Sequence, residues 1–220
     1  MAERAAVRED VGMERRTPPS AAAEDVHLVW QAAGRRARIE SVLAALLGEL
    51  AGVPSSDVEL SLACPVCGAR HGRPSVGYPA TPSGGEWFGD AAVGHGGQLA
   101  AASLRHRVGV GLEAIVARPS QVLERAAFHP EELAALDALE LDVRAHVRAT
   151  LWARKAALLR VLGHPGILEP AGFALSIPGA DAGAGRIVRA NDELAGLAAR
   201  IEFRDVAVTA GTAGSVAILR

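Results

Sequence analysis

Residues 107–113 read Arg-Val-Gly-Val-Gly-Leu-Glu, and this strict alternation of side chains predicts a β-strand with two different faces. The apolar side chains at 108, 110 and 112 fall on one face. Two glycines and Glu113 fall on the other. Residues 87–93 and 98–104 are also predicted to be strands, so three candidate strands follow one another in the middle of the chain.

The chain before these strands divides into a tail, short strands, a helix and a long loop. Residues 1–23 are polar, charged and rich in alanine and proline, and we expect a disordered tail. Leucines at helical spacing predict a helix over about 35–51, and the glycine- and proline-rich residues 63–90 are mostly loop. Alternating side chains predict further strands at 26–30, 58–62 and 75–78.

The chain after the central strands begins with an irregular bridge at 114–129. Pro130 and the two glutamates after it predict a helix that runs to Leu162, with a break near Leu141, and Gly163 ends it. Short strands are predicted at 172–177, 185–189, 200–204, 205–210 and 214–219, with a short helix at 191–198. This order of elements indicates the α+β class.

The bulk composition limits the classes of function. The chain has 220 residues, enough for a core, and its net charge of −2 argues against a nucleic-acid-binding or membrane-surface protein. The first residues lack the apolar segment of a signal peptide, and no apolar run approaches the ~18 residues that span a bilayer. Two cysteines are too few for a disulfide framework, so we expect a cytoplasmic protein.

Two charged positions are candidates for chemistry. Of the 23 lysines and arginines only Lys155 is a lysine, and the two residue types are not interchangeable at a compact charged site. Lys155 shares a helix face with Arg148 and Trp152, which suits a phosphate or diphosphate; the alternative is a solvated face with Trp152 in the core. Glu113 at the strand end suits a hard cation, or is a solvated strand-end acid.

Two further segments leave alternatives open. Cys64-x-x-Cys67 with His71 suggests zinc, but a structural zinc site takes four ligands, usually from two such pairs. A tight loop with two reduced thiols is therefore the favoured interpretation. His95 lies among glycines that let the backbone approach a ligand closely, or that simply form a turn.

Taken in order, these segments resemble the surfactin-type 4'-phosphopantetheinyl transferases. The similarity runs from about Val26 to the C-terminus. It rests on segments in the family's order: Cys64 to Pro74 (Cys-x-x-Cys-Gly…His-Gly-Arg-Pro), the turn at His95, Gly109 to Glu113, Phe128-His129-Pro130-x-Glu132, and Leu151-Trp152-x-x-Lys155-x-x-x-Leu159.

The resemblance implies a pseudo-twofold pair of similar α+β halves, here 24–113 and 114–220, with the active site in the cleft between them. It implies a monomer of the holo-acyl-carrier-protein synthase type, which moves the phosphopantetheine arm of coenzyme A to a serine of an acyl or peptidyl carrier protein. It also implies Mg²⁺ between carboxylates and the coenzyme A diphosphate, with catalysis by positioning and charge neutralisation. The identity of the carrier protein is left open.

The resemblance also assigns roles by position. Glu113 matches a metal ligand and Lys155 faces the diphosphate, and these two are the expected catalytic residues. Arg160 is the second basic residue, His95 lies near the 3'-phosphate of coenzyme A, and Arg73 lies beside its pantetheine and adenine. The N-terminal arginines that are candidates for the same 3'-phosphate are Arg35, Arg36 and Arg38.

The chain departs from the family where the metal is expected. The family has aspartate at the position of Gly111 and glutamate at that of Ala156, and Glu132 is a nearby acid that could move in as a ligand. Loss of one charge-stabilising group typically costs on the order of 10²–10³ in rate. The chain is therefore either an attenuated transferase or a catalytically inactive homologue that binds a carrier protein, another partner or coenzyme A without transfer. Dependence on Mg²⁺ separates the two.

Overall fold

The computed structural model describes residues 25–32, 38–94, 96–163, 169–179 and 185–220. The expected tail at 1–23, and the candidate residues Arg35, Arg36 and His95, lie outside them. The strands are β1 (His27–Ala32), β2 (Glu59–Ser61), β3 (Ser75–Tyr78), β4 (Phe88–Gly94), β5 (Gly97–Ser103), β6 (Arg107–Ala114), β7 (Ala174–Leu175), β8 (Ile187–Arg189), β9 (Ile201–Val206) and β10 (Thr212–Leu219). The α-helices are α1 (Ile39–Ala51), α2 (Gln121–Ala127), α3 (Pro130–Asp137), α4 (Leu141–Leu162) and α5 (Asp192–Ala195).

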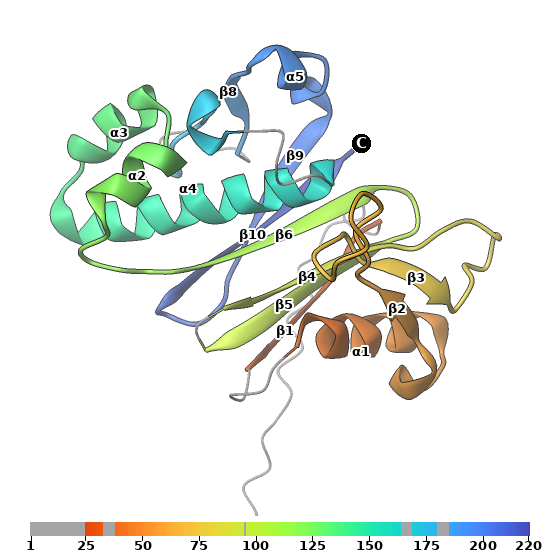
Figure 1. The fold of residues 1–220 in the computed structure, drawn as a ribbon. Coiled ribbons are helices and arrows are strands. Elements are labelled where there is room, and N and C mark those ends of the chain that lie inside the picture. The colour runs from red at the N-terminus through yellow and green to blue at the C-terminus, as the bar shows by residue number, and fades with distance from the viewer. Residues whose placement is uncertain (1–24, 33–37, 95, 164–168, 180–184) are drawn as a thin grey trace, which may run out of the picture.

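Two three-stranded antiparallel sheets form the centre of the molecule (Figure 1). The first sheet has the strand order β1-β5-β4, and the second has the order β6-β10-β9. Two smaller sheets pair β2 with β3 and β7 with β8. All but the last residue of strand β6 falls within 24–113, the range expected for the N-terminal half, but its hydrogen bonds pair it with β10 of the C-terminal half.

A helix covers the outer side of each large sheet, so the molecule has four layers: α1, the first sheet, the second sheet and α4 (Figure 1). Leu99 of β5 and Val110 of β6 belong to the apolar layer between the two sheets. The neighbouring Ala100 faces the other way and packs in the core with α1. On the far side, Phe203 and Ala217 pack in the core with α4.

Helix α4 lies directly against β6, with glycines at the contact. A Cβ atom on Gly111 would lie 1.9 Å from the carbonyl oxygen of Ala153, and one on Gly109 would lie 2.2 Å from that of Ala157. The backbones of α4 and β6 therefore touch, because Gly109 and Gly111 have no side chains on the face of β6 that meets the helix. No larger residue, aspartate included, fits at Gly111 in this packing.

The order of elements confirms the α+β class. The predicted helix break is also confirmed, since α3 ends at Asp137 and α4 begins at Leu141. Two other expectations are wrong. The bridge at 114–129 contains α2, which the sequence pattern hides because only Ala127 of this helix is buried. The strand expected at 205–210 is absent because β9 continues to Val206 and a turn then leads into β10.

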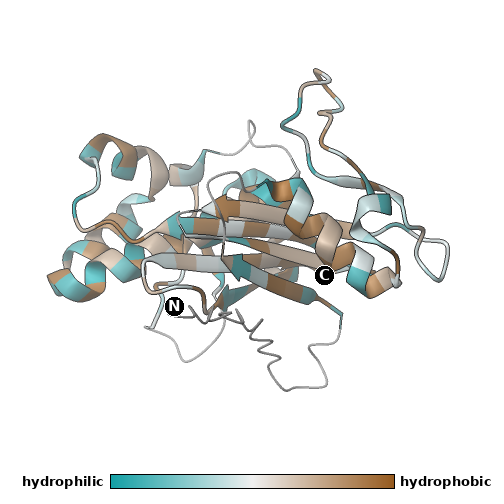
Figure 2. Cartoon of the chain, turned by 90° about the horizontal axis from the view of Figure 1, so that it is seen from below, coloured by the Kyte–Doolittle hydropathy of each residue, from teal (hydrophilic) through white to brown (hydrophobic). Residues whose placement is uncertain are grey.

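The described helices contain no segment that combines the length and the apolar character needed to cross a bilayer. The longest of them, α4, has 22 residues and includes several arginines. Apolar residues are instead concentrated on the strands at the centre of the molecule (Figure 2).

We predict that Gly111→Ala lowers the free energy of unfolding by about 3 kcal/mol, because the new methyl group overlaps helix backbone, which cannot swing aside as a side chain can. Gly196→Ala is the matched control, since a Cβ atom there meets no atom within 4 Å. Urea denaturation followed by circular dichroism measures both variants. Equal midpoints for the two would contradict the predicted contact between α4 and β6.

Candidate functional site

Lys155 is wholly buried on the side of α4 that faces α3 and β7. Its Nζ lies 2.7 Å from Oε2 of Glu132 and donates to the carbonyl oxygens of Pro170 at 2.6 Å and Phe173 at 2.8 Å. Burial lowers the pKa of the ammonium group, and the nearby Glu132 carboxylate only partly opposes this. An ammonium group has three protons, and all three have acceptors here. Lys155 thus has no donor left for a diphosphate in this arrangement.

Glu132 is equally committed to the fold. It is 1% exposed, and its carboxylate also accepts hydrogen bonds from the backbone N–H groups of His129 and Leu175, both at 2.8 Å. The bond to His129 completes a capping box at the start of α3. To serve as a metal ligand, Glu132 would have to leave Lys155 and both backbone donors.

Glu113 lies near the end of β6 and is half-buried. Burial raises the pKa of its carboxyl group, and a hydrogen bond with Trp152 opposes the rise without cancelling it. At the other two positions where the family has acidic residues near the metal, this chain has Gly111 and Ala156, which carry no carboxylate. A single carboxyl group with a raised pKa does not fit the magnesium site that the resemblance implies.

Asp90 and Arg160 form the charged contact that joins the two sheets to α4. Asp90 is 2% exposed, and its Oδ2 accepts hydrogen bonds from the backbone N–H of Val110 and from Nε of Arg160, both at 2.7 Å. A second guanidinium nitrogen of Arg160 donates to Oδ1 of Asp90 and to the carbonyl oxygen of Ala91. Burial alone would lower the pKa of Arg160, but the hydrogen bonds and charge of Asp90 outweigh it and raise that pKa.

Two more arginines lie nearby: Arg73 near Asp90 and Arg160, and Arg107 near Arg73. Burial lowers the pKa of Arg73, and the nearby charges of Arg107 and Arg160 lower it further, while Asp90 opposes them. Among the described residues, Arg73 and Arg107 take part in no ion pair. We call Arg73, Arg107 and Arg160 the arginine cluster. Its three positive charges exceed the single negative charge of Asp90, which favours the approach of anions.

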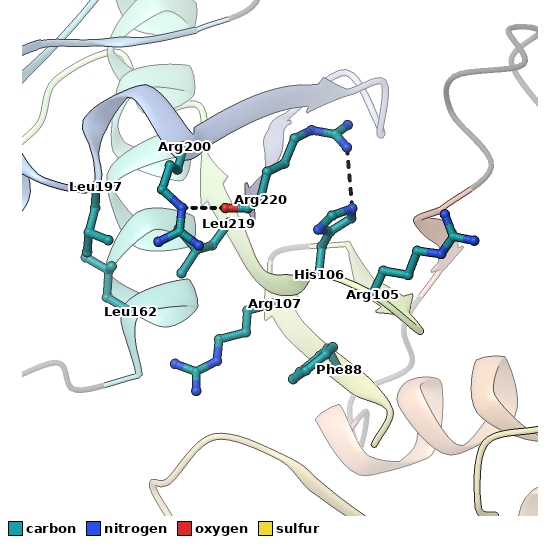
Figure 3. Close-up of a pocket in the computed structure, with 9 residues that line it drawn as sticks. All are labelled: Phe88, Arg105, His106, Arg107, Leu162, Leu197, Arg200, Leu219 and Arg220. Carbon is teal, nitrogen blue, oxygen red and sulfur yellow. Dashed lines mark hydrogen bonds between the residues drawn. The ribbon is translucent and has the colours of Figure 1, made fainter. Parts of the chain in front are cut away.

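The arginine cluster adjoins a cavity of about 460 Å³ that opens between the two halves (Figure 3). Arg107 extends into it, and His106 and Arg220 approach each other at its rim, with their nitrogens 3.5 Å apart. Basic and apolar side chains alternate around the wall. The cavity is lined by Phe88, Arg105, His106, Arg107, Leu162, Leu197, Arg200, Leu219 and Arg220.

The structure gathers only part of the set of site residues expected from the sequence. Arg73 and Arg160 meet around Asp90. Glu113 lies at the opposite end of β6 from Arg107, about 20 Å away along an extended strand. Lys155 lies on another side of α4, and His95 is outside the described residues.

Sequence reasoning missed Asp90 and Arg107. The available signal for Asp90 was its position inside a predicted strand, in the run Phe88-Gly-Asp-Ala-Ala-Val, where a lone acid needs a partner once it is buried. Arg107 gave no signal beyond its position at the start of β6.

No protein-family model matches the chain, and no curated protein matches it either.

We predict that Glu132→Gln lowers the free energy of unfolding by about 3 kcal/mol or more, because it leaves the Lys155 charge buried without its partner. Its neighbour Glu131 provides the control. Glu131 pairs with Arg189 at the surface, where the two side chains are 52% and 63% exposed, so Glu131→Gln should cost less than about 1 kcal/mol. Urea denaturation compares the two variants. If Glu132→Gln proved as stable as Glu131→Gln, the ion pair would have no structural role.

Glu113→Gln should stabilise the protein in a pH-dependent way. Because the folded state raises the pKa of Glu113 above its ordinary 4.5, ionisation of this group costs folding free energy at higher pH. On this account the variant and the wild type should be about equally stable below pH 4.5. As the pH rises from there through the raised pKa of Glu113, the free energy of unfolding of the variant should increasingly exceed that of the wild type. Thermal melts from acid to neutral pH measure the difference. A difference that shrinks with rising pH would contradict the argument.

Proposed function

We propose that this protein is a 4'-phosphopantetheinyl transferase-like protein that binds coenzyme A between its two halves. The observation that carries the proposal is the arginine cluster around Asp90, beside the cavity between the halves. Coenzyme A carries a diphosphate and a 3'-phosphate, and guanidinium groups bind such oxygens with paired hydrogen bonds. The apolar side chains of the cavity suit the adenine and the pantetheine arm.

The fold gives independent support. The chain uses the same sequence of elements twice: β1, α1, β4 and β5 in the first half, and β6, α4, β9 and β10 in the second. In each half the last strand lies between the other two, as the orders β1-β5-β4 and β6-β10-β9 state. A pseudo-twofold pair of α+β halves requires this repetition, which is the architecture that the resemblance implies.

Transfer of the arm is the first candidate activity. A serine oxygen of a carrier protein would attack the phosphorus that bears the pantetheine arm, the diphosphate bridge would break, and adenosine 3',5'-bisphosphate would leave with the serine proton passing to solvent. The arginine cluster supports this reaction by neutralising charge on the phosphates. The missing carboxylates at Gly111 and Ala156 make the expected rate low.

Binding without transfer is the second candidate, and two observations favour it. Gly111 has no room for the acid that the family carries there, and Lys155 has all its protons engaged within the fold. Both features remove groups that the family uses at the diphosphate, while the arginines remain.

Coenzyme A binding tests the proposal, and isothermal titration calorimetry measures it. Arg73→Gln and Arg107→Gln should each weaken binding roughly tenfold, because each removes one charge-assisted contact worth about 1.5 kcal/mol. Arg160 is a poor choice for this test because its loss would leave Asp90 buried and unpaired. Arg189→Gln is the control, since Arg189 is exposed and pairs only with Glu131 among the described residues. No coenzyme A binding by the wild type, or no difference among the three variants, would refute the proposal.

Mass spectrometry of an intact apo carrier protein then separates the two candidates. The carrier is incubated with this protein, coenzyme A and Mg²⁺, and a known transferase is run beside it. A mass increase of one phosphopantetheine arm would show transfer. Coenzyme A binding without that increase would show a protein that only binds.

A further inference from the structure

A separate cluster of reactive side chains lies in the loop between β2 and β3. Cys64, Cys67 and His71 each offer one ligand atom, and these atoms lie within 4.8 Å of one another. The Cys67 sulfur and Nε2 of His71 are 3.0 Å apart. Around one tetrahedral Zn²⁺, with Zn–S of about 2.3 Å and Zn–N of about 2.0 Å, ligand atoms lie roughly 3.5–3.8 Å apart. Side-chain shifts of about 1 Å or less, with Cys67 and His71 moving slightly apart, would bring all three onto one ion.

A closed turn holds Cys64 and Cys67 close together. Gly68, at φ 73°, turns the chain so that its N–H donates to the carbonyl oxygen of Cys64 at 2.8 Å. The two cysteines are thereby held on one side of a closed turn.

The second arm of the loop places His71 beside them. The N–H of His71 donates to the carbonyl oxygen of Ala69 at 2.9 Å, and that of Gly72 donates to the carbonyl oxygen of Leu62 at 2.8 Å. A Cβ atom on Gly72 would lie 2.6 Å from the carbonyl oxygen of Ala63, so the two arms are in close contact. Backbone hydrogen bonds thus position the three donors before any ion arrives.

We propose that Cys64, Cys67 and His71 together bind one Zn²⁺, with water as the fourth ligand. Two sulfurs and an imidazole select zinc over magnesium or calcium, which take oxygen ligands. No other set of His, Cys, Asp and Glu in the described ranges brings three ligand atoms this close. The exposed Cys67 and His71 give the ion a path from solvent. Zinc here crosslinks the two arms of the loop, independently of whether the protein binds coenzyme A.

The sequence pattern alone disfavours this site because it has one Cys-x-x-Cys pair instead of two. The structure adds what the pattern does not contain: the turn that closes on the carbonyl of Cys64, and the proximity of His71 to Cys67. With three protein ligands the site is weaker than a closed four-ligand site and keeps one exchangeable position.

Zinc competition against a chromophoric chelator tests the proposal with untagged full-length protein kept reduced by a phosphine. The wild type should bind one Zn²⁺ per chain, and Cys67→Ser and His71→Ala should each weaken binding by at least ~tenfold. The control is His146→Ala, which removes an exposed histidine on α4 and should leave zinc affinity unchanged. Cys64 is left intact because it is buried.

Cobalt provides a second readout that does not depend on the variants. Co²⁺ added to the reduced wild type should give thiolate-to-metal charge-transfer absorption, and this band should weaken in Cys67→Ser. Three results would overturn the proposal: no zinc binding by the reduced protein, equal affinity in all variants, or a Cys64–Cys67 disulfide on oxidation with no metal affinity in the reduced state.

Discussion

Helix α4 rests on β6 with backbone against backbone at Gly109 and Gly111, and this contact sets the distance between the helix and the second sheet. Leu151 and Leu158 of the same helix are fully buried in the core on its other sides. A side chain at Gly111 would lift the helix and open that core. The packing that holds the layers together therefore leaves no room for an acid at position 111, where the resemblance implies a second metal ligand.

Asp90 connects this packing to the charge at the cavity. Its buried carboxylate needs both Val110 of β6 and Arg160 of α4, so the first sheet, the second sheet and the helix meet at one group. One arginine suffices to balance Asp90. Within the part of the chain that the structure describes, Arg73 and Arg107 have no acidic partner of their own, and the positive charge of Arg107 lowers the pKa of Arg73. The proposed anion would relieve this repulsion.

Sequence patterns predicted the parts of the fold in which the alternation of polar and apolar residues shows directly which side chains are buried. The alternation along 107–113 located β6, and the glutamates after Pro130 located the start of α3, because strand pairing and helix capping are local. The same reasoning could not find α2, which buries almost nothing. It also could not bring Asp90 to Arg160, since that contact joins residues 70 positions apart. Contacts between residues of different layers depend on how the layers pack, and the spacing of residues along one helix or strand does not contain that information.

The single lysine shows that composition can mark a residue as unusual without locating it in the fold. Lys155 stands out among arginines because its site requires a compact ammonium group, and a point charge with three protons meets three acceptors and the face of Phe173, 4.5 Å from the ring centre. A planar guanidinium has five N–H donors and could not satisfy them in that closed space. The same compactness would suit a diphosphate, so composition cannot distinguish a structural ion pair from a ligand contact. Burial distinguishes them, because Lys155 is 0% exposed and its three protons already have acceptors within the fold.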